Sequence, residues 1–436
     1  MVVVFILGLL VSSLMERRAE VASVFNNKRT VFEDSIVAQN EKFKADYPRE
    51  YETWAMTEDT TFKSKYNSSQ EVDVLEQRPE MVVLWAGYAF SRHYNTPRGH
   101  KHALEDMRKI LRTGNPGIML KTADGRDSIA ADMQPATCWT CKGPDVPRMM
   151  RELSSSKSVF DPANFYAKKW SELGAEEVNT IGCSDCHDAR TMDLRPARPA
   201  LYEAFARRGL NVKDVTHQEM RSLVCAQCHV EYYFAPDGKA TTLPYTGLSV
   251  MNPDDMYAFY ESIGFTDYTN PRTGVKQLKT QHPEFETYMG AGSVHASMFT
   301  CADCHMEKVT KEDGTTYLSH ALISPLQSDS IKATCAACHA DLDAFVHGIQ
   351  EKMEERTIAI GNKLAQLTDK LADAVASGKY TDEQLDAIRA LNRKGQWYWD
   401  FVFVENSEGA HNSKLDNSCL DKADALIEEA LSLLEF

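Results

Sequence analysis

The chain has 436 residues, of which 43% are hydrophobic and 25% are charged, so it holds enough apolar side chains for one large domain or a few smaller ones. A wholly disordered protein is excluded. The 63 acidic residues outnumber the 48 basic ones and give a formal net charge of −15, so nucleic-acid binding is not expected. Eleven cysteines are too few for a disulfide scaffold of this length, so their arrangement matters more than their number.

The N-terminus carries the one stretch of sequence that suits contact with a lipid bilayer. Residues 2–14 are strongly apolar except for one glycine and two serines. The stretch is short for a membrane-spanning helix but has the length of the apolar part of a secretory signal. We therefore expect residues 1–15 to be a signal peptide or an N-terminal anchor, which implies export. A buried N-terminal helix is the alternative.

The next segments predict irregular structure followed by a helix. Residues 16–80 are polar and charged with scattered aromatic side chains, which indicates irregular structure lying over a core. The run MVVLWAGYAF at residues 81–90 is apolar on every side. A helix is predicted from His100 to Leu111, and it would end at the turn sequence Thr113-Gly114-Asn115-Pro116.

Beyond residue 341, apolar residues recur at intervals of three and four positions, which is typical of long amphipathic helices. The first of these helices is predicted to end at Gly378. The second would begin after Thr381, whose spacing to Gln384 fits a capping box, and the third covers Lys414–Phe436. No long strand pattern interrupts the rest of the chain, so the expected fold class is mainly α. Long helices of this kind at a chain end usually form packing or dimerisation surfaces.

Five Cys-x-x-Cys units lie between residues 138 and 338, and four of the five are followed at once by histidine. Histidine makes up 13 of the 436 residues, so these placements do not arise by chance. The cysteine pairs are Cys138/Cys141, Cys183/Cys186, Cys225/Cys228, Cys301/Cys304 and Cys335/Cys338, and the histidines that follow are His187, His229, His305 and His339.

The spacing of these units matches covalent haem attachment. Two thiols three positions apart can add to the two vinyl groups of one haem, and the next side chain then points back at the iron. Zinc ribbons do not need the following histidine, and redox dithiols need one cysteine pair rather than five. We therefore expect five covalently bound haem c groups. Bacteria attach such haems outside the cytoplasm, which agrees with export.

The unit Cys138-Trp139-Thr140-Cys141-Lys142 carries lysine in place of histidine. A lysine binds iron only as the neutral amine, so burial and the metal must remove its proton. An electron-transfer haem needs two permanent ligands, whereas a reacting haem needs one open position. The lysine unit is therefore the expected catalytic centre. The alternative is a degenerate site in which Lys142 is solvated.

Nine histidines remain after the four that follow cysteine pairs. If four haems have two histidine ligands each, four of the nine are distal ligands, and enough remain for an active-site histidine. The sequence pattern alone does not identify them. The nine are His93, His100, His102, His217, His282, His295, His320, His347 and His411.

Further motifs extend from about residue 80 to about residue 420. They are Leu84-Trp85-Ala86-Gly87-Tyr88, Pro97-Arg98-Gly99-His100, Leu111-Arg112-Thr113-Gly114, Cys228-His229-Val230-Glu231-Tyr232-Tyr233-Phe234 and Gln281-His282-Pro283-Glu284. Together with the lysine-bearing unit and the four Cys-x-x-Cys-His units, they resemble the pentahaem cytochrome c nitrite reductases, the ammonia-forming enzymes of the bacterial periplasm. The lysine-bearing unit is nearly diagnostic of that family.

The resemblance implies the six-electron reduction of nitrite to ammonium at the haem ligated by Lys142. Arg112, Tyr232 and His282 would surround the substrate. Arg112 supplies a cation for an anionic substrate, His282 can donate a proton, and Tyr232 can hydrogen-bond or relay protons. Without the resemblance, the same three residues also fit a helix C-terminus contact, a core tyrosine and a further haem ligand.

The resemblance also implies a calcium ion beside the active haem. Its ligands would be the Glu231 carboxylate, the backbone carbonyls of Tyr232 and Lys279, and the side-chain oxygen of Gln281, and oxygen ligands suit this hard cation. The ion would favour entry of an anion despite the negative net charge. The implied distal haem ligands are His100 for Cys225/Cys228, His295 for Cys335/Cys338, His320 for Cys183/Cys186 and His411 for Cys301/Cys304.

The expected organisation is a signal or anchor over residues 1–15, a pentahaem catalytic region over residues 16–340 with its loops packed around five haems, and a long-helix region over residues 341–436 that forms a homodimer interface. The resemblance implies a periplasmic location, with or without membrane association. Electrons would come from a membrane multihaem quinol dehydrogenase or a small cytochrome. The alternative function is a multihaem electron-transfer cytochrome in which every iron has two protein ligands.

Overall fold

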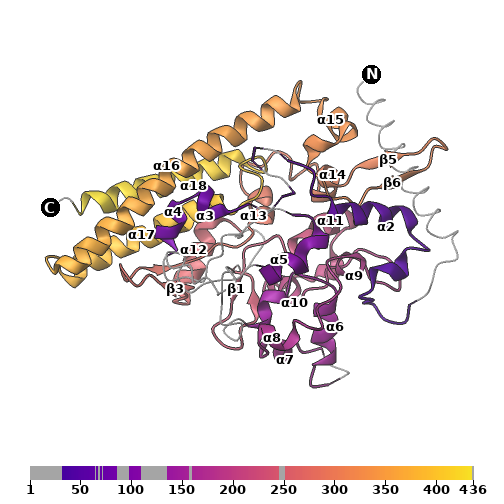
Figure 1. Cartoon of the computed structure of the whole chain (residues 1–436), viewed down its shortest axis with the longest axis horizontal. Helices are drawn as coiled ribbons and strands as arrows, with labels where there is room; N and C mark the ends of the chain where they lie inside the picture. Colours follow the sequence, from indigo (N-terminus) through magenta and orange to yellow (C-terminus); the bar gives the residue numbers. More distant parts are fainter. Residues whose placement is uncertain are drawn as a thin grey trace, which may run out of the picture.

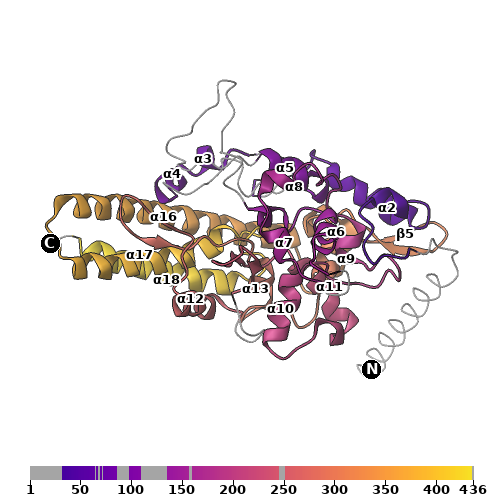
Figure 2. The same ribbon diagram turned by 90° about the horizontal axis from the view of Figure 1, so that it is seen from below.

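The computed structural model describes residues 32–63, 65–66, 69–70, 72–85, 98–109, 135–156, 160–244 and 251–434. Long C-terminal helices lie at one end of the molecule, and short helices joined by loops lie at the other (Figure 1, Figure 2). The mainly α class expected from the sequence is confirmed. The predicted signal or anchor over residues 1–15 lies outside the described residues.

Three long helices form the C-terminal part of the chain: α16 (Leu342–Ser377), α17 (Asp382–Phe403) and α18 (Ser413–Ser432). The first ends at Gly378, whose φ of 63° is a left-handed conformation that glycine adopts without strain. The predicted capping box begins the second, because the backbone N–H of Gln384 donates to the Thr381 hydroxyl (3.3 Å) and the N–H of Thr381 donates to the Gln384 side chain (2.8 Å). The third begins one residue earlier than predicted and ends before the predicted Phe436, which lies outside the described residues.

The apolar stripes of these helices face one another inside the chain. At the closest approach the ring of Trp399 on α17 lies against Gly361 on α16, and the indole N–H of Trp399 donates to the carbonyl of Thr357 (2.9 Å). The packing role predicted for these helices is thus fulfilled within the chain, whereas the dimer interface stays a prediction. Fully buried side chains of the bundle include Leu364, Leu367, Leu371, Trp397, Trp399, Phe401 and Ile427.

The apolar run predicted at residues 81–90 joins this bundle. Its first residues form the end of α4 (Glu80–Leu84), which packs on α16, and Trp85 behind it is fully buried. Residues 86–97 lie outside the described part of the chain.

The rest of the described chain consists of short helices and three two-stranded hairpins. The helices after residue 97 are η3 (His100–His102), α5 (Ala103–Lys109), η5 (Ala136–Trp139), α6 (Asp145–Glu152), α7 (Ala163–Tyr166), α8 (Trp170–Leu173), α9 (Cys183–Cys186), α10 (Pro199–Arg207), η6 (Val212–Asp214), α11 (His217–Ala226), α12 (Pro253–Ser262), α13 (Glu284–Met289), α14 (Cys301–His305), η8 (Pro325–Gln327) and α15 (Asp329–Cys335). The antiparallel hairpins pair β1 (Tyr233–Phe234) with β2 (Thr241–Thr242), β3 (Tyr268–Thr269) with β4 (Lys276–Gln277), and β5 (Lys308–Thr310) with β6 (Thr316–Leu318).

The N-terminal half contains helices where irregular structure was predicted, and it also contains the start of the helix predicted from His100. The segment expected to be irregular contains η1 (Asn40–Phe43), α2 (Pro48–Ala55), η2 (Met56–Glu58) and α3 (Val74–Gln77). Its polar composition hid α2, which has proline in its first turn and a Tyr51–Trp54 ring contact three positions apart (5.3 Å between centroids). The helix predicted from His100 is present as η3 and α5 up to Lys109, and its predicted end lies outside the described residues.

Within the described ranges, no helix combines the length and the apolar composition needed to cross a membrane.

Gly361→Ala is expected to lower the free energy of unfolding by about 1–3 kcal/mol, because the new Cβ would lie 2.9 Å from the buried Trp399 ring. Gly348→Ala in the same helix is the matched control. Nothing lies within 4 Å of its added Cβ, so alanine should raise stability by about 0.5–1 kcal/mol. Denaturant unfolding of the haem-loaded protein followed by circular dichroism measures both. Shifts of the same sign would contradict the close approach at Gly361.

Candidate active site

Each cysteine motif folds as a single helical turn. The backbone N–H of the residue after each motif donates to a carbonyl one turn earlier. In three histidine motifs, those of His187, His229 and His339, the acceptor is the carbonyl of the first cysteine, at 2.9 Å each. In the lysine motif, the N–H of Lys142 donates to the carbonyl of Trp139. The motif of Cys301 and Cys304, the fourth in the chain, forms α14. None of the ten motif cysteines, all of which the structure describes, is in a disulfide. A helical turn places residues three apart on one face, so both thiols of a motif can reach one porphyrin edge.

The motifs also lie next to one another. The thiol of Cys141 lies beside that of Cys228, and the thiol of Cys225 lies beside that of Cys301, so the first motif adjoins the third and the third adjoins the fourth. Cys304 and Cys335 also lie near each other, which places the fifth motif next in order. Four of the five attachment points, all but that of the second motif, therefore form a series that begins at the lysine motif.

Nine of the ten motif cysteines are partly buried, and Cys338 is exposed. Haem attachment through the five pairs of thiols stays a prediction.

Three pairs of imidazole rings are spaced as two ligands on opposite sides of one metal. The ring centroids are 6.3 Å apart for His187 and His320, and 6.1 Å apart both for His295 with His339 and for His305 with His411. A metal–imidazole bond is about 2 Å long and the ring centre lies about 1 Å further, so two rings on one metal are about 6 Å apart. These residues fit three haem irons, in the pairing that the resemblance implies.

The Nδ1 atoms of these rings have partners of their own. His187 Nδ1 pairs with the carbonyl of Met192 (2.8 Å), His305 Nδ1 with that of Ile323 (3.0 Å) and His320 Nδ1 with that of Leu318 (3.0 Å). A carbonyl accepts only from N–H, so the proton lies on Nδ1 and Nε2 remains for a metal.

His411 differs from these rings because its Nδ1 partner is a carboxylate. Glu405 Oε1 lies 2.5 Å from Nδ1, and Glu405 itself is only 2% exposed. Its other oxygen accepts from the Ser407 hydroxyl (2.6 Å), and that hydroxyl in turn accepts from the backbone N–H of His411 (2.8 Å). This short loop thus fixes the position of the carboxylate that pairs with His411.

The two histidines of the fourth predicted pair, His100 and His229, lie in the same region as Lys142 of the lysine motif. Desolvation and the charges of His229 and Lys142 lower the pKa of His100 to about 4, so these three residues share one region. No ring distance defines this pair in the described structure. The His229 ring also lies 6.4 Å from that of His282.

A shared carboxylate explains this last contact. Glu284 Oε2 lies 3.7 Å from His229 Nδ1, and Glu284 Oε1 lies 3.9 Å from His282 Nδ1. Both rings therefore place Nδ1 within 4 Å of the same carboxylate. Burial opposes the charged form of Glu284, but the adjacent His229 and His282 rings lower its pKa to about 2.

Three of the four residues predicted to be catalytic lie in the described chain. Desolvation lowers the pKa of His282 to about 4 despite Glu284, with help from the charges of His229 and Lys142, so His282 and Lys142 are brought together. Tyr232 is half-buried and stacks on Phe234 (5.9 Å between centroids). Arg112 lies outside the described residues.

The four predicted calcium ligands form one local group. Glu231 Oε2 accepts from the backbone N–H of Gln281 (2.6 Å), and the Gln281 side chain reaches the carbonyl of Lys279 (2.9 Å). Glu231 is 1% exposed, and burial raises its pKa well above the usual range. A divalent cation would supply the charge that this buried carboxylate needs, so the residues fit calcium. Among the described residues no cluster of three or more His, Cys, Asp or Glu side chains forms a metal site.

The segment that carries these ligands is tied to the C-terminal bundle. The Lys279 ammonium, fully buried, donates to both oxygens of Asp400 on α17 (2.9 and 3.0 Å). Asp400 also accepts from the backbone N–H of Thr280 (2.7 Å), and Asp267 accepts from that of Lys279 (2.7 Å). Two carboxylates thus fix the backbone just before His282.

The sequence profile of cytochrome c552 matches residues 39–435.

The chain belongs to the cytochrome c552 family.

Relatives in this family include two proteins named cytochrome c-552. That of Porphyromonas gingivalis is 45% identical over 421 residues, which are 94% of this chain and 78% of the relative. That of Bacteroides thetaiotaomicron is 47% identical over 420 residues, 94% and 79% of the two chains. The solved cytochrome c nitrite reductase of Desulfovibrio desulfuricans, described with two calcium sites in its catalytic subunit, superposes with a TM-score of 0.78 at 28% identity, covering 91% of this chain and 86% of that one. The resemblance and the multihaem fold expected from the motifs are confirmed.

Sequence reasoning did not single out several residues of this cytochrome c552 site. Glu284 appeared only as the last letter of a motif, and the roles of Glu405 and Asp400 depend on partners that come from other parts of the fold. Loop carboxylates carry no periodic signal. Their partners become visible only in three dimensions.

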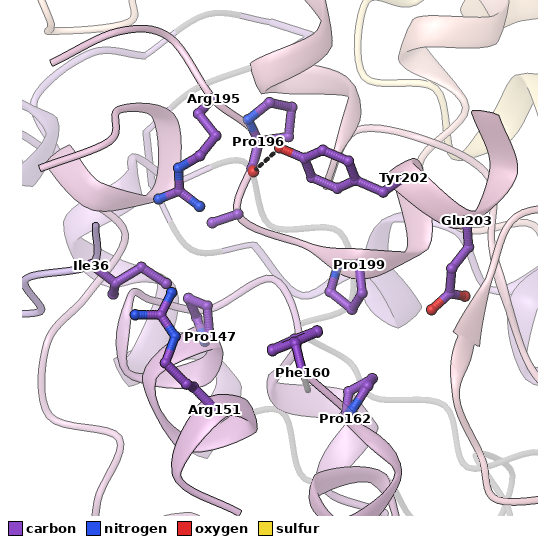
Figure 3. Close-up of a pocket in the computed structure, with 11 residues that line it drawn as sticks. Ile36, Pro147, Arg151, Phe160, Pro162, Arg195, Pro196, Pro199, Tyr202 and Glu203 are labelled. Carbon is purple, nitrogen blue, oxygen red and sulfur yellow. Dashed lines mark hydrogen bonds between the residues drawn. The ribbon is translucent and has the colours of Figure 1, made fainter. Parts of the chain in front are cut away.

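A hollow of about 350 Å³ lies between α6 and α10 (Figure 3). Arg151, Phe160, Arg195 and Tyr202 contribute to its wall, together with four prolines, and none of the predicted site residues lines it. Arg195 donates to the carbonyls of Ser184 (3.3 Å) and His187 (3.5 Å), so the hollow lies behind the second motif. It is separate from the group around Lys142.

Glu405→Gln is expected to raise the reduction potential of the haem held by His305 and His411, because a carboxylate on Nδ1 favours the more positive ferric iron. The expected shift is on the order of 60 mV, a tenfold change in a one-electron equilibrium. Spectroelectrochemical titration measures it. Glu408→Gln, which removes a carboxylate from the same loop, is the control and should leave that potential nearly unchanged. Equal shifts in both variants would contradict a direct effect of Glu405.

Proposed function

We propose that this cytochrome c552 reduces nitrite to ammonium at a haem c attached to Cys138 and Cys141 and ligated by Lys142. The reaction takes six electrons and eight protons and yields ammonium and two waters. The observation that carries the proposal is the allocation of ligands. Three of the histidine motifs have an imidazole partner at the spacing of two ligands on one metal. His100 lies near His229 of the other histidine motif, and the remaining motif presents lysine. One iron with one unusual ligand is what a reacting centre needs.

Haem c with an open position would supply the electrons and the site where the substrate nitrogen binds. The protein would supply orientation and protons. Glu284 lies on the Nδ1 side of His282, which leaves Nε2 as the atom able to donate to a substrate oxygen. Tyr232, next to the calcium ligand Glu231, would hydrogen-bond the substrate, and Arg112 would neutralise its charge.

Calcium completes this arrangement. The proposed ligands are Glu231, the carbonyls of Tyr232 and Lys279, and Gln281, which belong to the two segments that carry Tyr232 and His282. An ion bound to both segments would fix their separation. It would also place positive charge near an anionic substrate in a protein whose net charge is −15.

The remaining roles extend this proposal. A homodimer through residues 341–436 is supported by exposed apolar side chains on α16, Phe345 (50%) and Ile358 (37%). Haem attachment supports a periplasmic location, with or without membrane association. The electron donor would be a membrane multihaem quinol dehydrogenase or a small cytochrome, and the boundary near residue 340 remains a proposal.

Lys142→Met should abolish ammonium formation from nitrite with a chemical electron donor while leaving five covalent haems, because thioether ligation cannot reproduce the lysine-bound iron. Ion chromatography measures the ammonium formed, and intact mass spectrometry measures the number of covalently bound haems. Lys168→Met, at a side chain that is 41% exposed, is the control and should keep full activity.

The same preparations separate an enzyme from an electron carrier. If one haem is open, wild-type ferric spectra contain a high-spin component that shifts on adding nitrite or cyanide. A wild-type protein without that component, or full nitrite reduction by Lys142→Met, would refute the proposed site and leave an electron-transfer cytochrome.

Glu231→Gln should lower both the calcium content and the turnover of nitrite, since the neutral amide loses the only proposed charged ligand. Metal analysis and steady-state rates with added calcium measure the effect, and prolonged chelation of the wild type should mimic it. Glu203→Gln, which changes an exposed residue on α10, is the control. An undiminished calcium content in Glu231→Gln would show that other residues bind the ion.

A further inference from the structure

Arg198 is a buried cation that contacts the lysine motif on both sides of its ligand. It is 1% exposed and immediately precedes α10. Its Nε donates to the carbonyl of Thr140, and its Nη2 donates to the carbonyl of Gly143 (3.0 Å). Thr140 and Gly143 flank Cys141 and Lys142, so one guanidinium holds the backbone before and after the proposed iron ligand.

The same side chain reaches the second motif. Arg198 Nη1 donates to Asp185 Oδ1 (2.6 Å), and Asp185 lies between Cys183 and Cys186. The second carboxylate oxygen of Asp185 accepts from the backbone N–H of Gly182 (2.8 Å) at the start of the motif turn. The ion pair is buried at both ends, with side-chain exposures of 1% and 4%.

The third motif is joined through Gln227, which lies between Cys225 and Cys228. Its side-chain oxygen accepts from the backbone N–H groups of Ala197 (2.6 Å) and Arg198 (3.1 Å). Its amide donates to the carbonyl of Asp185 (2.8 Å). The segment around Arg198 is therefore bonded to three haem motifs at once.

The shape of the guanidinium matters in this arrangement. Its donors point in fixed, coplanar directions, and here three nitrogen atoms serve two carbonyls and one carboxylate. A lysine ammonium is a single point charge that could balance Asp185 but could not hold both carbonyls in these directions. Charge compensation and backbone positioning can therefore be separated by substitution.

Resting on the proposed function, we propose that Arg198 is a positioning residue for catalysis, which fixes the direction from which Lys142 meets its iron. It acts through the backbone carbonyls of Thr140 and Gly143 and does not touch the substrate. The bonds to Asp185 and Gln227 hold Arg198 itself in register with the motifs that supply electrons.

The test compares Arg198→Lys with wild type as haem-loaded proteins. The variant should keep five haems and unchanged low-spin signals from the histidine-ligated haems. Its high-spin ferric signal, seen by electron paramagnetic resonance, should shift or broaden, and kcat for nitrite should fall about tenfold or more with a smaller change in KM. Arg195→Lys is the matched control, because Arg195 lies three residues away and donates to backbone carbonyls of the second motif and of Ser35, away from the lysine motif.

A second variant guards against a simple folding defect. Asp185→Asn/Arg198→Gln replaces the ion pair with two neutral groups, so no unpaired charge is left buried, but the contacts to both carbonyls are lost. It should show the same altered high-spin signal.

Three results would overturn the proposal: an unaltered high-spin signal in both variants, an equal change in Arg195→Lys, or loss of haem from both variants, which would make Arg198 a folding residue. None of these would affect the proposed function, which fails only if wild type itself lacks an open, nitrite-responsive haem.

Discussion

The distance that one iron imposes on its two ligands is the constraint from which the rest of the structure follows. Two imidazoles about 6 Å apart must come from segments distant in sequence, as His187 and His320 do, while both thiols of each motif stay on one helical turn. Long regular elements would not bring so many segments together in so small a volume. Short helices, turns and small hairpins do so, and the three long helices stabilise them from one side.

Buried charge is the second theme of the molecule. The overall charge is −15, yet the candidate substrate is an anion, and the carboxylates of Glu231 and Glu284 are buried close to where it would bind. Such groups are costly unless a cation or protonated partner accompanies them. Histidines accompany Glu284, and a calcium ion would accompany Glu231. Each of these buried carboxylates therefore requires a positively charged partner beside it.

The parts of this structure that could be predicted from sequence are those encoded locally. Gly378 ends a helix and Thr381 begins the next because capping depends on residues a few positions apart. The cysteine motifs are equally local, and family motifs then supplied pairs such as His305 with His411, whose rings meet at 6.1 Å. What could not be predicted depends on long-range contacts. The Arg198 side chain reaches back 58 positions to Thr140, and Lys279 finds Asp400 121 positions away.

The Lys279–Asp400 ion pair joins the haem-bearing part of the chain to the C-terminal helix bundle. Asp400 belongs to the middle helix of the bundle, while Lys279 belongs to the segment that leads to His282, and both are fully sequestered from water. A version of the chain cut ahead of α17 would strand an ammonium in an apolar interior without its counter-ion. This buried ion pair therefore couples the stability of the bundle to that of the haem-bearing part.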